Sequence, residues 1–191
     1  MQKIILGFVG DLAAGKGAIC KYLKEKYGIN SYRFSTPLRD VLDRLYVEKN
    51  RENLQKLSTV IRENFSQDIL SKIIAEDAVN DKNEIVAVEG IRRPSDIVYL
   101  EKIDGFHLVY ITAESKLRWE RLLKRNENLG DDKKTYEEFL RDEQAEADRL
   151  IKELGKKCEF TINNNGNFGE LYENLENILN SLRKNDYENK N

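Results

Sequence analysis

The fold of this 191-residue chain is decided by Gly10-Asp11-Leu12-Ala13-Ala14-Gly15-Lys16-Gly17. This stretch matches Gly-x-x-x-x-Gly-Lys, the pattern of a phosphate-binding loop, and lies between an apolar run at 3–9 and a helical pattern at 17–27. Glycines let backbone N–H groups turn toward phosphate oxygens, the helix N-terminus adds partial positive charge, and Lys16 reaches the outer phosphates. The loop predicts a nucleotide site with contacts from Gly10, Asp11, Ala13, Ala14, Gly15, Lys16, Gly17 and Ala18.

Strand and helix patterns alternate along the rest of the chain. Further short strands are predicted at 32–35, 84–89, 106–112 and 158–162. Helical spacing of apolar residues is found over 37–80, 94–102, around 117–123, from 135 onward and over 168–183. This alternation indicates βαβ units and a mostly parallel sheet covered on both faces. We expect an α/β fold of the P-loop NTPase class: a three-layer α/β/α sandwich around a five-stranded sheet.

Nothing in the sequence divides the chain into separate domains, because it has no internal repeat and no linker. We expect one domain over 1–191, with a core formed by 1–35, 83–125 and 135–184. The helical segment 36–82 is predicted to be an insert, and the polar segment 126–134 a short lid.

Composition excludes several classes of protein. The chain has 32 Lys and Arg against 34 Asp and Glu, a net charge of −2, which argues against a nucleic-acid coat. Its apolar runs are far shorter than the roughly 20 residues of a membrane span, and no signal-peptide pattern opens it. Cys20 and Cys158 lie far apart without a CxxC pattern, and a single His107 leaves little room for His-based nucleophilic catalysis. We expect a cytoplasmic protein that binds neither membrane nor nucleic acid.

The residues after Lys16 carry a family resemblance. Ser or Thr normally follows this lysine and binds Mg²⁺, whereas here Gly17 follows. A glycine at this place resembles the adenylate kinase branch of nucleotide kinases, whose loop reads GxxGxGKGT; Ala13 and Ala18 depart from that pattern. The resemblance implies that Mg²⁺ is held by phosphates, water and a carboxylate from elsewhere. Asp11 would repel a triphosphate unless it faces away or meets the metal.

Two other strand ends resemble the acceptor site of nucleoside monophosphate kinases. Phe34-Ser35-Thr36-Pro37-Leu38-Arg39 resembles S-T-x-x-L-R, and Glu89-Gly90-Ile91-Arg92-Arg93 is similar to D-G-F-P-R. The resemblance implies that the acceptor is bound by Ser35, Thr36, Arg39, Glu89, Arg92 and Arg93. By spacing the family arginine falls on Arg93, and in related families on Arg92. The alternatives are a solvated surface arginine at 39 and a carboxylate at 89 that caps a neighbouring loop.

The second half of the chain has two further resemblances. Arg121 and Arg125 lie four residues apart on one helix face and resemble the start of the lid in monophosphate kinases. The first would then pack on the base and the second reach the phosphates; the alternative is a solvated charged face. The stretch from 106 to Asn164 resembles dephospho-coenzyme A kinases, which implies that Asn164 lies near adenine. In the insert, 55–57 and Arg62 resemble viral-type deoxynucleoside monophosphate kinases, and the resemblance implies that the insert 36–82 binds the acceptor.

Together these patterns predict a kinase that uses ATP and Mg²⁺ to phosphorylate a nucleoside monophosphate. Its catalytic residues are expected to be Lys16, Glu89, Arg93, Arg121 and Arg125, with no direct metal ligand and Glu89 reaching the metal through water. One alternative is a dephospho-coenzyme A kinase-like enzyme, in which Glu89 acts as base on a hydroxyl. Another is a nucleotide-binding module without transfer. Either a monomer or a homodimer is expected.

Overall fold

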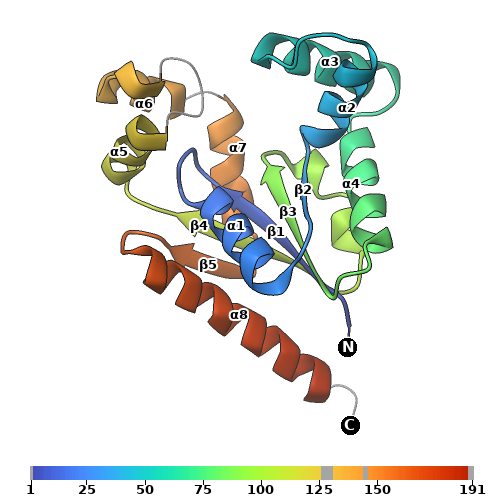
Figure 1. Ribbon diagram of the computed structural model, residues 1–191, viewed down its shortest axis with the longest axis vertical. Coiled ribbons are helices and arrows are strands. Elements are labelled where there is room, and N and C mark those ends of the chain that lie inside the picture. The colour runs from blue at the N-terminus through green and yellow to red at the C-terminus, as the bar shows by residue number, and fades with distance from the viewer. Residues whose placement is uncertain (1, 126–130, 144–145, 189–191) are drawn as a thin grey trace.

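A computed structural model describes residues 2–125, 131–143 and 146–188 of the chain. Its centre is a five-stranded parallel sheet with the order β2-β3-β1-β4-β5 (Figure 1). The strands are β1 (Ile4–Gly10), β2 (Ser31–Arg33), β3 (Ile85–Ile91), β4 (Phe106–Thr112) and β5 (Phe160–Asn163). All seven residues of β1 are buried, as its unbroken apolar sequence predicts for a central parallel strand. The predicted α/β sandwich with a five-stranded sheet is confirmed.

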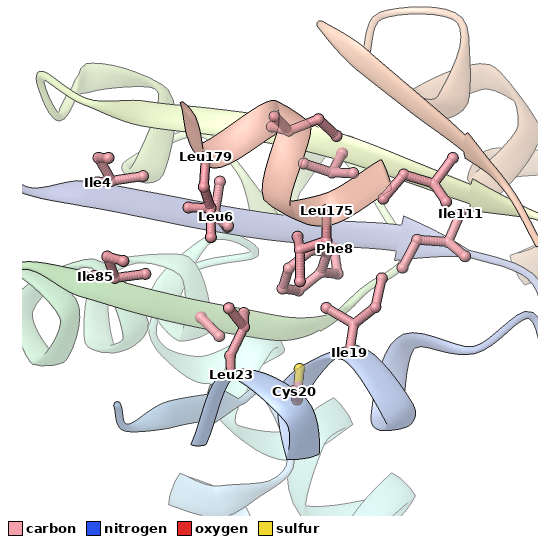
Figure 2. Close-up of a cluster of buried hydrophobic side chains, with 14 of the residues drawn as sticks. Ile4, Leu6, Phe8, Ile19, Cys20, Leu23, Ile85, Ile111, Leu175 and Leu179 are labelled. Atoms are coloured by element: carbon pink, nitrogen blue, oxygen red, sulfur yellow. The ribbon is translucent and has the colours of Figure 1, made fainter. Parts of the chain in front are cut away.

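Helices cover both faces of the sheet. On one face, α1 (Lys16–Tyr27) and α8 (Phe168–Glu188) pack on alternate residues of β1, and Figure 2 shows Leu6 and Phe8 between Leu23 and Leu175. On the other face, Ile5 of β1 belongs to a second core with α4 (Ile69–Asn80) and α7 (Glu146–Gly155). Because side chains alternate along a strand, one apolar strand supplies both cores. The carboxyl ends of the strands are thereby fixed, and ligands bind at these ends in such sheets.

Two helical arms extend from the sheet. The segment predicted as helical over 37–80 forms α2 (Thr36–Arg44), α3 (Arg51–Asn64) and α4, and α2 and α3 make the first arm. The second arm is α5 (Ser115–Arg125) with α6 (Tyr136–Glu143). In Figure 1 the arms lie on opposite sides of the loop that joins β1 to α1. None of the helices in the described ranges is long and apolar enough to cross a bilayer.

The helix predicted over 94–102 is wrong. The structure has two short 3-10 turns there, η1 (Pro94–Asp96) and η2 (Leu100–Lys102). An α-helix would direct the N–H of Tyr99 to the carbonyl four residues earlier, but this N–H donates instead to Ser71 Oγ, 3.1 Å away. Packing against α4 therefore interrupts the helical pattern that the apolar spacing indicates.

Thr135 and Glu138 form a capping box at the start of the helix predicted from residue 135 onward. The Thr135 N–H donates to the Glu138 carboxylate at 2.8 Å, and the Glu138 N–H donates to Thr135 Oγ1 at 3.2 Å. These bonds to Thr135 lower the pKa of Glu138. The helix that begins with these bonds is α6, and α7 follows from residue 146. Before α6, the short 3-10 turn η3 (Asp131–Lys133) lies within the predicted lid.

Candidate nucleotide and acceptor site

The loop between β1 and α1 has the backbone that the phosphate-binding pattern requires. Gly15 has φ +118°, and a Cβ there would lie 2.3 Å from Asn164 Nδ2, so only glycine fits this position. Lys16 begins α1, and its ammonium donates to the carbonyl of Gly10 and, at 2.8 Å, to that of Asp11. The ammonium of Lys16 thus lies against the loop in which it is predicted to bind the outer phosphates.

Ala13 stands where the adenylate kinase-like loop has its central glycine. Its φ of +58° is in the left-handed region, which costs a residue with a Cβ about 1–2 kcal/mol. The loop therefore keeps the backbone conformation of the glycine-containing pattern although the glycine is replaced.

The loop provides no hydroxyl for a metal ion. Gly17 and Ala18 occupy the places where Ser or Thr is usual, and a Cβ at Gly17 would meet no heavy atom within 4 Å. Among the described residues, no group of three His, Cys, Asp or Glu side chains could hold a metal ion. The loop thus fits a polyphosphate. A metal ion there would be coordinated by phosphate oxygens, water and single carboxylates.

Asp11 is balanced by a buried arginine that the sequence analysis did not single out. The Asp11 carboxylate lies 3.9 Å from Arg118 Nη2, and both side chains are 5% exposed. Arg118 also donates to the Ala113 carbonyl at 2.9 Å and pairs with Glu143 of α6. One oxygen of Asp11, Oδ1, is buried without a hydrogen-bond partner. Arg118 accounts for a carboxylate beside the loop, because it compensates a charge that would otherwise oppose an anion. An acid in such a loop indicates that a cation lies nearby, but the sequence does not identify Arg118 as that cation.

Arg121 and Asn164 form a network with the loop. Arg121 donates to the backbone carbonyls of Asn164, at 2.9 Å, and Gly166, at 3.4 Å. The Asn164 side chain is buried and donates to the Ala14 carbonyl at 2.8 Å. Burial lowers the pKa of Arg121. The α5 helix, the turn after β5 and the phosphate-binding loop are therefore joined before any ligand binds. The side-chain amide of Asn164, predicted to lie near adenine, is hydrogen-bonded to the phosphate-binding loop itself.

The rest of the predicted lid lies partly outside the described residues. Arg125 is the last residue of α5, but the position of its side chain is outside the described part of the chain, as are residues 126–130. Residues 131–133, which complete the predicted lid together with Lys134, form the 3-10 turn η3.

Glu89 is paired at the end of β3. Its carboxylate accepts from Arg33 Nε at 2.7 Å and from Arg33 Nη2 at 3.2 Å. The two residues are register neighbours on β2 and β3, and Gly90, with φ +86°, follows at an irregularity in the register between β1 and β3. The cost of burying Glu89 was expected to be relieved by a metal-bound water or a substrate; an arginine of the protein relieves it here. The sequence places Arg33 inside the strand predicted over 32–35, but it does not identify Arg33 as the partner of Glu89.

Glu89, Arg33 and Lys16 converge on the same region of the protein. Burial raises the pKa of the Cys20 thiol; Glu89 raises it further, and Arg33 and Lys16 lower it. All three charges therefore act on one side chain of α1. The region at the ends of β1, β2 and β3 thus contains the buried acid Glu89 together with the cations of Arg33 and Lys16.

The other predicted acceptor ligands lie on the surface near the same strand ends. Ser35 precedes α2 and its carbonyl accepts from the Arg39 N–H at 3.0 Å, while Thr36 is the first residue of α2. The side chains of Arg39, Arg92 and Arg93 are exposed. By contrast, Arg62 does not reach this surface: it is buried and pairs with Asp96, 3.0 Å away.

The site can now be compared with known proteins. The AAA domain family matches residues 9–140, a range that includes the phosphate-binding loop, the insert and most of α5 and α6. The chain belongs to this family. Among its relatives, a UPF0200 protein of Sulfurisphaera tokodaii is 30% identical over 176 residues, which are 92% of this chain and 95% of the relative. A UPF0200 protein of Methanococcus maripaludis is 28% identical over 185 residues, 95% and 99% of the two chains.

Solved structures share the fold of this AAA domain protein. TT1252 from Thermus thermophilus has a TM-score of 0.62 at 17% identity and covers 95% of this chain and 99% of its own. Shikimate kinase from Bacteroides thetaiotaomicron has a TM-score of 0.62 at 12% identity, over 94% and 98% of the two chains. At these identities the likeness is one of fold. The protein has the fold of a P-loop kinase.

Proposed function

We propose that this protein is a small-molecule kinase that transfers the γ-phosphoryl group of ATP to a nucleoside monophosphate. One observation carries the proposal: cationic residues follow the ends of neighbouring strands β1, β2 and β3, with Lys16 after β1, Arg39 after β2 and Arg93 after β3. Phosphoryl transfer between two anions depends on positioning and on positive charge more than on a nucleophilic side chain.

The two sides of β1 have different roles in this proposal. Arg121, Asn164 and the loop form the ATP side, where β4 and β5 end, and Lys16 binds the outer phosphates. Arg39, Arg92 and Arg93 bind the acceptor phosphate on the side of β2 and β3, with Ser35 and Thr36 beside them. Glu89, held by Arg33, orients the acceptor or a water ligand of the metal. Arg125 and the lid segment 126–134 exclude water from the transfer.

The nucleotide site fits Mg²⁺ held through phosphates and water. When bound, the ion neutralises charge on the phosphates that are transferred and released. Because Gly17 and Ala18 have no hydroxyl, the carboxylate assigned to a contact with the ion through water is that of Glu89. The protein itself contributes the loop N–H groups and the ammonium of Lys16.

A hydroxyl acceptor is the alternative that the site chemistry allows. A shikimate kinase from Acinetobacter baumannii in complex with shikimate, with a TM-score of 0.53 at 16% identity, shares the fold. A hydroxyl acceptor benefits from a base, and Glu89 is the carboxylate at that place. The bidentate contact with Arg33 uses one lone pair on each Glu89 oxygen and gives the carboxylate a structural role without a base function, which favours a phosphate acceptor.

A coupled assay for ADP formation tests the proposal. The folded protein is given Mg-ATP with each common ribo- and deoxyribonucleoside monophosphate, and separately with dephospho-coenzyme A and shikimate. Transfer to one or more monophosphates, above the rate of ATP hydrolysis, supports the proposal. Transfer to a hydroxyl acceptor alone replaces it with the alternative. Tight ATP binding by calorimetry without any transfer indicates a nucleotide-binding module.

A further inference from the structure

Arg62 and Asp96 form a buried ion pair outside the loop and its network. Arg62 Nη2 lies 3.0 Å from Asp96 Oδ1, and the two side chains are 9% and 5% exposed. Arg62 is near the end of α3, in the helical insert, whereas Asp96 is in η1, after β3. The pair therefore joins the insert to the segment that leaves the central sheet.

The second oxygen of Asp96 determines the backbone of the turn after β3. Asp96 Oδ2 accepts from the N–H of Arg92 at 3.0 Å and from the N–H of Arg93 at 3.1 Å. A carboxylate that accepts several backbone N–H bonds fixes the local conformation. The two arginines thus have exposed side chains on a backbone that is held from inside the protein.

The other end of the pair is fixed in the insert. Arg62 Nη1 donates to the carbonyl of Gln67, between α3 and α4. Arg62 Nε is buried without a hydrogen-bond partner, so the pair is not arranged for the greatest stability. Buried ion pairs contribute little net stability compared with apolar packing, and some are retained because they specify geometry.

We propose that Arg62 and Asp96 are positioning residues for the acceptor: the pair holds the Arg92–Arg93 turn in place and ties it to the insert. The proposal rests on the proposed function, in which these arginines bind the acceptor phosphate. Because α2 packs against α3, the same tie fixes Arg39 relative to Arg93. Neither Arg62 nor Asp96 touches the substrate.

Two variants and one matched control test this. Arg62→Lys keeps the charge but loses the planar guanidinium that joins Asp96 to Gln67, and Asp96→Asn keeps the shape but removes the charge. Ser71→Ala is the control, because it removes another buried bond between the insert and the same segment, at Tyr99, without touching the turn. If Asp96→Asn does not fold, Arg62→Lys still tests the proposal.

The readouts are amide hydrogen exchange at the N–H groups of Arg92 and Arg93 and the KM for each substrate. We expect both variants to exchange these N–H groups faster and to raise the KM for the monophosphate about tenfold, with the KM for ATP changed less than about twofold. Ser71→Ala should leave the exchange at 92–93 and the ratio of the two KM values unchanged.

Two results would overturn the inference. One is an unchanged acceptor KM in both variants, and the other is an equal rise in both KM values, which indicates general damage. Failure of the proposed function is recognised separately, because wild-type protein then transfers phosphate to no monophosphate. Exchange at 92–93 in that case still decides whether the pair holds the turn.

Discussion

The two sides of the central strand differ in how completely they are organised without a ligand. On the β4–β5 side, Arg121, Asn164 and Arg118 are all bonded to the phosphate-binding loop or to the turn beside it. On the β2–β3 side, Arg39 and Arg93 are exposed on the surface. Preorganised ligands bind at a lower entropic cost, whereas exposed arginines must be ordered by the substrate. Under the proposed function, the nucleotide side is therefore already assembled, and the acceptor completes the acceptor side.

The largest effect is expected at the residue that serves both sides. Lys16→Met should lower kcat/KM by about 10³-fold or more, because it removes the cation at the transferred phosphate. The coupled assay measures this, and Lys21→Met, an exposed lysine on the same helix, is the control. A Lys16→Met enzyme with more than a tenth of wild-type activity would contradict the assignment of Lys16.

The assembled side should lose stability when its buried cation is removed. Arg118→Met leaves Asp11 and Glu143 without their partner, and breaking a buried pair in this way costs about 3–5 kcal/mol. Urea unfolding measures the loss. Arg141→Met, an exposed arginine on α6, should unfold like the wild type. Equal stability of both variants would mean that the network at Asp11 does not hold the loop.

The acceptor side should show the opposite behaviour. Arg39→Gln and Arg93→Gln should each raise the acceptor KM by a factor equivalent to about 1.5–3 kcal/mol, since each removes a charged hydrogen bond to phosphate. Stability should change by less than about 0.5 kcal/mol because the side chains are exposed. Acceptor titrations at saturating ATP, beside urea unfolding, separate the two effects. Arg44→Gln, exposed at the end of α2, is the control.

A smaller effect is expected within the loop itself. Ala13→Gly should stabilise the protein by about 0.5–1 kcal/mol, because relief of the left-handed conformation exceeds the entropy that glycine adds to the unfolded chain. Ala18→Gly, in the first turn of α1, should have the opposite sign, since glycine weakens a helix. Thermal unfolding of both variants measures the difference, and a destabilised Ala13→Gly would show that the loop is not strained.

The smallest effect concerns the start of α6. The pKa of Glu138 is lowered in the folded protein by bonds to Thr135, so its stabilising contribution is present above the pKa of the unfolded chain. That contribution is lost as the pH falls through the lower, folded pKa. Glu138→Gln should therefore lower the urea midpoint slightly at about pH 7, and the difference should shrink as the pH falls through the folded pKa of Glu138. Glu137→Gln on the same turn is the control, and a difference that persists in acid would contradict the prediction.

Local patterns could be read from the sequence, and long-range pairs could not. The phosphate-binding loop, the central strand and the capping box at Thr135 depend on residues within a few positions of one another, so their spacing identifies them. The partner of Asp11 is Arg118 and the partner of Glu89 is Arg33. These pairs can be predicted only when the strand order and register are known, and residue spacing encodes neither.

The helix predicted over 94–102 is also wrong because of a contact between residues distant in the sequence. Apolar spacing over 94–102 is compatible with an α-helix, but one bond to Ser71, in another element, redirects the N–H of Tyr99. Arg62 was compared with kinases in which the insert serves the acceptor directly, yet burial with Asp96 removes it from the surface. Tertiary contacts decided both cases against a plausible local pattern.

The central position of β1 also has a consequence for how the chain folds. Strand β1 is synthesised before its partners β3 and β4, with which Ile4 pairs at Ile85 and Ile5 at Phe106. Its apolar side chains therefore have no partner strand until residues 85–91 exist, close to half of the 191-residue chain. Pairings across such long separations slow folding, and an unpaired apolar strand is prone to aggregate meanwhile. The strand that fixes the phosphate-binding loop in the native state is thus a segment that needs protection during synthesis.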